Sequence, residues 1–212
     1  MTTNNIAVFI DGDSVVPKYL LEIIKEINLY GNILINNIYA DWSHQSKINL
    51  LVSARHTGIT TIQADLISGK NSTDIKLAVD VMRTLYHFTN IDVFYLVASD
   101  YDYRHLVPEI KQYGKKVCCI GTENTNKSLI NICDSFTLIK NIINKDIRES
   151  IIQLIETTNK YTDLSMINMM LKRTHKFDIR DTDCITLKEY MLKNYNDLLE
   201  ISNCSKAIVT LK

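Results

Sequence analysis

Short apolar runs alternate with amphipathic stretches along the first two thirds of the chain. The runs have the length of buried strands, and the stretches between them repeat apolar residues at the spacing of a helix. Strands are predicted at residues 6–10, 33–40, 59–64, 92–98 and 115–120, and helices at 16–29, 43–56, 73–88, 103–113 and 126–133. This alternation predicts an α/β domain over residues 1–140, with a central parallel sheet covered by helices on both faces.

Glycine and proline mark element ends. Gly31, Gly58 and Gly114 each follow a predicted helix, where a left-handed residue often ends the last turn. Pro108 falls inside the predicted helix 103–113 and should kink or shorten it, because proline has no amide hydrogen to donate.

The pattern changes after residue 140. The polar stretch 141–147 predicts a hinge between two domains. Beyond it the apolar spacing predicts three short helices, and the last fifteen or so residues predict two short strands around a polar turn at 202–206. The helices are expected at 147–157, 164–172 and 187–195. Residues 148–212 are therefore predicted to form a small winged-helix-like domain.

Composition narrows the class of protein. Hydrophobic residues make up 46% of the chain, enough to bury a core, which excludes global disorder. Lys plus Arg and Asp plus Glu both number 24, so the formal net charge is zero. No overall basic field attracts a nucleic acid, and any such partner must be held by local patches or by metal ions.

Cysteine usage and the N-terminal sequence indicate the compartment. The five cysteines show no CxxC spacing, which argues against a disulfide framework or a zinc site. The start, "MTTNNIAVF", lacks a signal-peptide pattern, and no apolar run approaches the roughly 20 residues of a spanning helix. We expect a cytoplasmic protein without a membrane partner.

Carboxylates follow two of the predicted strands. The stretch "IAVFIDGDSVV" ends a buried strand in Asp11 and Asp13, and "YLVASDYDY" ends another in Ser99, Asp100 and Asp102. The carboxyl ends of parallel strands form one rim, where ligands bind. An aspartate in such a turn is often only a cap. Several at one rim repel each other unless a cation neutralises them.

A fifth carboxylate joins this rim from a helix. Asp74 lies in the first turn of the helix opened by "GKNSTDIKLAVDVM", and helices start at the rim where strands end. Hard cations such as Mg²⁺ or Mn²⁺ take carboxylate oxygens, activate water and stabilise charge on a phosphodiester. We expect no matching Lys or Arg set at these turns, and assign Asp13 a supporting role. Lys70 would meet a phosphate or balance the carboxylates, whereas Asp80 lies about 240° around the helix from Asp74 and faces elsewhere.

These motifs together resemble the NYN family, a branch of the PIN-like nucleases related to bacterial LabA-like proteins. The resemblance covers most of residues 5–140 through "FIDGDSV", "GKNSTDIKLAVDVM", "LVASDYDYRHLVPEIKQYGKKVCCIG" and "NICDSFTLI". It implies a three-layer α/β/α domain that cleaves RNA with Mg²⁺ or Mn²⁺. The catalytic and metal-binding residues it implies are Asp11, Asp74, Asp100 and Asp102, with Lys70 and Ser99 nearby. Ser14 stands where family members often have Asn, and its hydroxyl has a shorter reach.

The segment 145–212 resembles the OST-HTH domain, also called LOTUS, through "LSMINMMLKRTHKFDIRDTDCITLKEYM" and "AIVTLK". This resemblance implies a winged-helix fold that binds RNA or a protein partner. A local basic group supports RNA binding, although a solvated helix end would have the same composition. The group consists of Lys172, Arg173, Lys176 and Arg180.

The sequence therefore predicts a metal-dependent endoribonuclease with a C-terminal RNA- or protein-binding module. Two alternatives stay open. One is a non-catalytic RNA-binding scaffold on the same frame. The other is a haloacid-dehalogenase-type phosphatase, since "DGDSV" fits its opening motif, with Asp11 as the nucleophile. The phosphatase reading leaves Asp74 and Asp102 without a role, and the oligomeric state is open.

Overall fold

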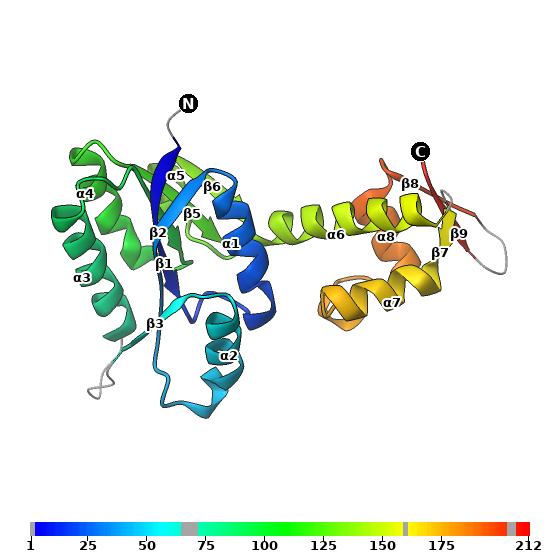
Figure 1. Ribbon diagram of the computed structural model, residues 1–212, viewed down its shortest axis with the longest axis horizontal. Coiled ribbons are helices and arrows are strands. Elements are labelled where there is room, and N and C mark those ends of the chain that lie inside the picture. Colours follow the sequence, from blue (N-terminus) through cyan, green and yellow to red (C-terminus); the bar gives the residue numbers. More distant parts are fainter. Residues whose placement is uncertain (1–2, 65–71, 159–160, 203–206) are drawn as a thin grey trace. The chain divides into compact units, whose positions relative to one another are not determined.

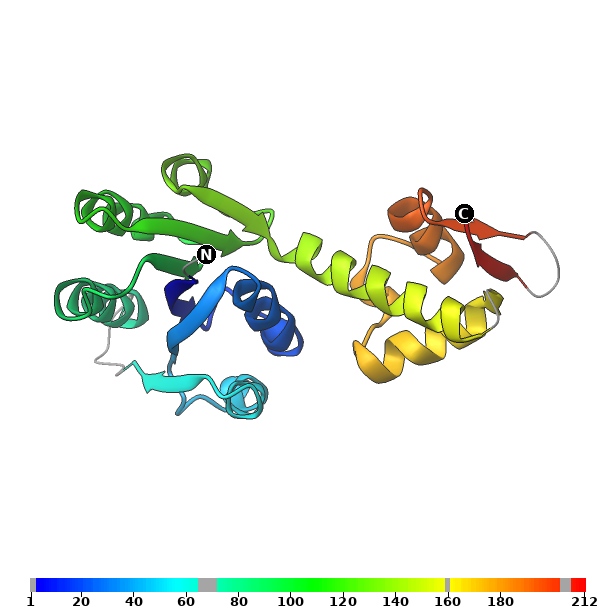
Figure 2. The same cartoon turned by 45° about the horizontal axis from the view of Figure 1, so that its top comes forward.

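The computed structural model describes residues 3–64, 72–158, 161–202 and 207–212. The chain divides into two compact units, Met1–Ile142 and Ile143–Lys212. Figures 1 and 2 show their elements from two directions. None of the helices in the described ranges is long and apolar enough to cross a lipid bilayer.

Within the described residues of the first unit, six parallel strands form one sheet in the order β3-β2-β1-β4-β5-β6. The strands are β1 (Asn4–Asp11), β2 (Gly31–Ala40), β3 (Thr60–Gln63), β4 (Val93–Val97), β5 (Lys116–Gly121) and β6 (Ser135–Leu138). The predicted parallel sheet is confirmed, and β6 is an addition that the hydrophobic pattern did not predict.

Helices cover both faces of this sheet. They are α1 (Leu20–Asn28), α2 (Ile48–His56), α3 (Ser72–His87), α4 (Leu106–Gln112) and α5 (Lys127–Ile132). Short 3₁₀ helices precede three of them, at η1 (Pro17–Tyr19), η2 (Gln45–Lys47) and η3 (Tyr101–His105). Figure 1 shows α1 and α2 on one face and α3 and α4 on the other, which confirms the three-layer α/β/α architecture.

Alternation along β1 decides where its last side chain points. Ala7 and Phe9 belong to the core that the sheet forms with α3 and α4, where they meet Leu77 and Val81 of α3. Side chains two residues apart on a strand share a face. Asp11, two residues after Phe9, is therefore directed to the side of the sheet on which α3 begins.

The predicted element ends are partly confirmed. Gly58 and Gly114 have φ of 70°, the left-handed conformation expected after a helix. Gly31 instead opens β2. Pro108 lies in the first turn of α4, where an amide hydrogen is not needed, and the stretch 103–113 is accordingly divided between η3 and α4.

The stretch 141–147, which was predicted to be a polar hinge, is helical, and the boundary between the two units falls within it. It lies inside α6 (Ile139–Thr157), which continues from one unit into the other. Apolar residues recur among the polar ones at spacings of three and four residues, and this spacing is sufficient to continue a helix. These residues are Ile139, Ile142, Ile143, Ile147 and Ile151.

The second unit contains the three predicted helices and a small sheet. After α6 come β7 (Tyr161–Asp163), α7 (Leu164–Thr174), η4 (Ile179–Asp181), α8 (Leu187–Tyr195), β8 (Leu199–Ile201) and β9 (Ile208–Leu211). The strands pair antiparallel in the order β7-β9-β8. The three helices and the strands share one apolar core, in which Tyr190 and Tyr195 are buried.

Candidate active site

The candidate site lies where the strand order reverses. β1 and β4 are neighbours in the sheet, but the chain continues from β1 toward β2 and from β4 toward β5, on opposite sides. Their following loops therefore separate and leave a crevice at the carboxyl edge, the usual ligand position in such sheets. Asp11 ends β1 at this point, and Ser99 and Asp100 directly follow β4.

Asp11 is the most deeply buried carboxylate of the group. Its side chain accepts the amide N–H of Asp13 at Oδ1 over 2.9 Å and the hydroxyl of Ser14 at Oδ2 over 2.7 Å. Only 4% of the residue is exposed. Burial, reinforced by the charges of Asp13 and Asp74, raises the pKa of Asp11 to about 6 despite these two hydrogen bonds. At neutral pH this carboxylate is ionised in surroundings that disfavour its charge.

Asp74 lies in the first turn of α3, and its negative charge acts on Asp11. The hydroxyl of Tyr103 donates to Asp74 Oδ1 over 2.6 Å, and Tyr103 is buried beneath η3. Burial raises the pKa of the Tyr103 hydroxyl, and the negative charges of Asp11, Asp74 and Asp100 raise it further. The Tyr103 hydroxyl thus contacts Asp74 directly and lies within electrostatic range of Asp11 and Asp100.

Asp100 and Asp102 share a loop but point differently. Asp100 caps η3, because its Oδ1 accepts the amide N–H of Asp102 over 3.0 Å. The Asp102 carboxylate lies 3.7 Å from Arg104, with 58% of its side chain exposed. Asp102 is therefore next to the cluster in sequence, while its carboxylate is directed toward a cation.

Ser14 connects the loops on the two sides of the crevice. Its hydroxyl donates to Asp11 and accepts the amide N–H of Ser99 over 3.0 Å. The Ser99 hydroxyl in turn lies 3.3 Å from that of Thr122 and accepts from Thr125 over 3.2 Å. A serine at position 14 is therefore long enough to join the loop after β1 to the loop after β4.

Gly12 and Lys47 fix the turn after β1. A Cβ on Gly12 would lie 2.7 Å from the carbonyl oxygen of Tyr39 and 2.9 Å from Cβ of Ala40, so no larger residue fits without displacement. Lys47 donates from Nζ to the Gly12 carbonyl over 3.0 Å and pairs with Asp13. No matching set of Lys or Arg was expected at these turns, but one such residue, Lys47, pairs with Asp13. Lys47 follows β2, whose carboxyl end lies at the same edge.

Acidic residues at the opposite edge of the sheet have structural partners. Asp92 accepts the amide N–H of Asn5 over 2.8 Å, and Asp134 accepts that of Val117 over 2.8 Å. Asp134 also pairs with Lys111, which holds the pKa of that carboxyl below its usual range. Such hydrogen bonds stabilise neighbouring strands, and they distinguish these carboxylates from the crowded group at the carboxyl edge.

Two other predicted residues have different outcomes. Asp80, which was expected to face elsewhere than Asp74, is buried and pairs with Lys76 over 3.2 Å and Arg83 over 2.9 Å. Lys70 lies outside the described residues, so its expected contact with a phosphate stays a prediction.

The basic group predicted to bind RNA is exposed at all four positions, Lys172, Arg173, Lys176 and Arg180. Arg180 is already engaged by Asp178 through both carboxylate oxygens. This contact holds the pKa of Asp178 far below its usual range. Lys172, Arg173 and Lys176 therefore form the part of this group that is better suited to bind a phosphate.

A serine, a histidine and an aspartate meet in the second unit. The His175 ring lies 2.9 Å from the Ser150 hydroxyl and 3.1 Å from Asp146. Ser150 is in the interior of α6, where its amide serves the helix and cannot stabilise an oxyanion. This contact therefore joins α7 to α6 and does not support a serine hydrolase.

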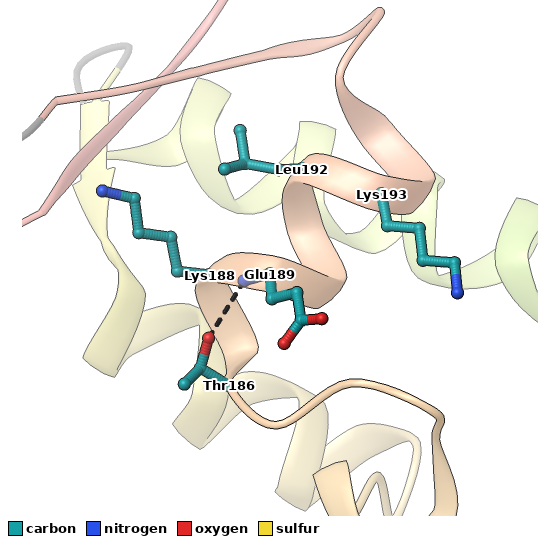
Figure 3. Close-up of a pocket in the computed structure, with 5 residues that line it drawn as sticks. All are labelled: Thr186, Lys188, Glu189, Leu192 and Lys193. Atoms are coloured by element: carbon teal, nitrogen blue, oxygen red, sulfur yellow. Dashed lines mark hydrogen bonds between the residues drawn. The ribbon is translucent and has the colours of Figure 1, made fainter.

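A hollow lies at the start of α8, in the second unit. Thr186, Lys188, Glu189, Leu192 and Lys193 line it. Figure 3 shows Thr186 capping the helix by accepting the amide N–H of Glu189 over 3.2 Å. These residues offer the hydrogen bonds of a helix cap and no arrangement suited to hydrolysis.

Comparisons with known proteins converge on the first unit. The family model for the NYN domain matches residues 5–140. The chain is 29% identical over 136 residues to the uncharacterized protein MJ0482 of Methanocaldococcus jannaschii, covering 62% of this chain. It spans about half, 53%, of that relative. A crystal structure of a protein of unknown function, VPA0982 from Vibrio parahaemolyticus, shares the fold, with a TM-score of 0.56 and 22% identity over 66% of this chain and 95% of the other.

Proposed function

Because the chain belongs to the NYN domain family, whose PIN-like fold is a nuclease-like ribonuclease fold, we propose that its first unit is a metal-dependent endoribonuclease. The observation that supports this proposal is that Asp11, Asp74 and Asp100 all lie within electrostatic range of the Tyr103 hydroxyl, at the switch point of the sheet. The substrate is RNA, and the bond broken is a phosphodiester.

The donor set suits Mg²⁺ or Mn²⁺. Carboxylate oxygens are the ligands that these ions prefer. The raised pKa of Asp11 marks a place where a nearby positive charge would be stabilised. Asp11, Asp74 and Asp100 would hold the ion, and Asp102 would join them by giving up its contact with Arg104. Such an ion, when bound, makes a water molecule more acidic and stabilises the negative charge that develops on the phosphate.

The chain's own groups organise this site. Ser14 and the Asp13 amide fix both oxygens of Asp11, and Tyr103 fixes one oxygen of Asp74. Asp13 is neutralised by Lys47 and supports the turn without holding the ion. Ser99 holds the loop after β4 against Ser14, and Lys70 is assigned the contact with a substrate phosphate.

The second unit is proposed to recruit the RNA. Its helix–strand–helix–helix–strand–strand order, with β9 between β7 and β8, is the arrangement of a winged helix. The exposed residues Lys172, Arg173 and Lys176 give a positive surface that the first unit's acidic edge lacks. An OST-HTH domain that contacts a protein partner is the alternative outcome.

The proposal is tested by incubating labelled single- and double-stranded RNA and DNA with the full chain in Mg²⁺, Mn²⁺ or EDTA. Cleavage of RNA is expected with a metal and not in EDTA. Asp100→Asn should abolish cleavage without unfolding the protein, because it removes one of several repelling charges. The matched control is Asp92→Asn, since Asp92 lies at the opposite edge and an amide oxygen can still accept from Asn5.

Three results would overturn the proposal. Unchanged cleavage by Asp100→Asn would exclude the acidic cluster as the active site. A phosphorylated Asp11 trapped during turnover of a phosphate ester would favour the phosphatase instead. RNA binding without cleavage under any of the metal conditions would favour the scaffold.

A further inference from the structure

An arginine stacks on an exposed tyrosine beside the acidic cluster. The guanidinium carbon of Arg104 lies 3.4 Å from the centroid of the Tyr101 ring. Its NH1 donates to the carbonyl oxygen of Tyr101 over 3.3 Å and lies 3.7 Å from Asp102. The guanidinium is thus held by a ring, a carbonyl and a carboxylate.

The short helix η3 explains why this pair faces outward. A 3₁₀ helix has three residues per turn, so Tyr101 and Arg104 lie on one side of it. Tyr103, on another side, is buried against Asp74. Tyr101 is 39% exposed, and 26% of the Arg104 side chain is exposed. One turn of helix therefore supplies both a buried hydroxyl for the cluster and a planar surface next to it.

The position of the pair relates it to the scissile bond. Tyr101 is the residue between Asp100 and Asp102, so its side chain begins within one residue of two carboxylates proposed to hold the ion. A phosphate at that ion carries a nucleotide on each side. Planar aromatic rings and guanidinium groups are the surfaces on which unpaired bases stack.

We propose that Tyr101 and Arg104 form a stacking platform for an unpaired base next to the cleaved phosphate, so that the substrate is single-stranded RNA or a single-stranded region of it. This inference rests on the proposed nuclease function. Bases inside a duplex are already stacked and do not offer a free face. The platform therefore selects against paired RNA at the point of cleavage.

The test combines variants of the full chain with altered RNA. Binding in Mg²⁺ is measured by fluorescence anisotropy on a short single-stranded RNA, on its blunt duplex, and on single strands carrying one abasic nucleotide at successive positions. Tyr101→Leu should weaken binding of the single strand by on the order of tenfold, because stacking on one residue typically contributes that much. Tyr101→Phe should bind as the native protein does.

Two further variants separate stacking from charge and from surface aromaticity. Arg104→Lys keeps the charge but loses the plane, and should weaken binding in the same direction as Tyr101→Leu. Tyr86→Leu is the matched control, since Tyr86 is also an exposed tyrosine. It lies twelve residues after Asp74 along α3, about 18 Å away. It should leave binding unchanged.

The decisive comparison is between the abasic RNA and Tyr101→Leu. One abasic position should weaken binding to the native protein and have no further effect on Tyr101→Leu, because both changes remove the same contact. The proposal would be overturned if the abasic nucleotide weakened binding to Tyr101→Leu as much as to the native protein at every position. It would also be overturned if the native protein bound the blunt duplex as tightly as the single strand. If the native protein never cleaves RNA, the nuclease proposal fails, but this binding comparison still decides whether Tyr101 stacks a base.

Discussion

The hydroxyl of Tyr103 donates a 2.6 Å hydrogen bond to Asp74, and this contact joins the 3₁₀ helix after β4 to the start of α3. Tyr103→Phe removes that one hydroxyl and keeps the buried ring. Removing a group that orients a metal ligand typically lowers the affinity for the metal by about 10- to 100-fold. We expect the Mn²⁺ concentration for half-saturation to rise by roughly tenfold, measured by titration calorimetry. Unchanged Mn²⁺ affinity would show that the hydroxyl does not orient Asp74 for an ion.

The raised pKa of Asp11 makes stability depend on pH. Its folded value is about 6, against an ordinary 3.8, so between these pH values the folded state binds more protons than the unfolded state. Stability of the first unit in EDTA should fall as pH rises through this window. This difference in pKa lowers the free energy of unfolding by at most about 3 kcal/mol above pH 6.

Asp11→Asn should remove this dependence. We expect the melting temperature of the variant in EDTA, minus that of the native protein, to rise by a few degrees between pH 4 and pH 8. Only the change in the difference with pH is diagnostic, because asparagine also loses one of the two hydrogen-bond acceptors at every pH. A constant difference across the range would contradict the raised pKa.

Gly12 should tolerate no side chain. Gly12→Ala places a Cβ within 3 Å of Tyr39 and Ala40, and forcing β1 and β2 apart should cost about 1–3 kcal/mol in urea unfolding. Gly58→Ala is the control: nothing lies within 4 Å of its Cβ position, and only the left-handed φ of 70° opposes the substitution. A smaller loss of about 1 kcal/mol is expected there. A Gly12→Ala protein as stable as the native one would show that the turn can move.

Lys47 should oppose the binding of a cation. Lys47→Met removes a positive charge beside Asp13, so Mn²⁺ affinity should rise a few-fold while binding of RNA weakens. The stability change should stay below about 1 kcal/mol, because 67% of the Asp13 side chain is exposed and the pair is largely solvated. Lys111→Met at the other edge should leave Mn²⁺ affinity unchanged, and an equal effect of both variants would indicate a general charge effect.

The basic residues of the second unit should account for part of the salt dependence of RNA binding. Replacing Lys172, Arg173 and Lys176 by alanine should lower the slope of log K against log salt by up to about 2, at roughly 0.7 per phosphate contact. Arg180→Ala should change the slope least, because Asp178 already neutralises Arg180. An unaltered slope in the triple variant would make protein contact the better function for this surface.

The sequence was sufficient to predict the parallel sheet and the edge near which Asp11, Asp74 and Asp100 lie, because parallel topology determines where strands and helices begin and end. It could not predict which way short polar side chains turn. Asp13 and Asp102 lie only two residues beyond Asp11 and Asp100, yet each is directed toward a cation: Lys47 and Arg104, respectively. Lys47 lies in η2, seven residues after the end of β2, so the strand-end rule did not indicate it.

The hydrophobic pattern of the sequence also could not predict contacts that buried side chains make. Tyr103 appeared to be one more aromatic residue of a helix, and only the 3₁₀ start of that helix turns it toward Asp74 while Tyr101 faces solvent. The polar residues of 141–147 indicated a hinge, although the isoleucines among them continue α6.

The most direct measurement of the central claim is anomalous X-ray diffraction from crystals of the full chain soaked in Mn²⁺. The account predicts an anomalous peak at the carboxyl ends of β1 and β4, within coordination distance of Asp11, Asp74 and Asp100, and its loss in Asp11→Asn crystals. A fully soaked crystal with no peak there, or with an ion held elsewhere and unaffected by Asp11→Asn, would contradict it.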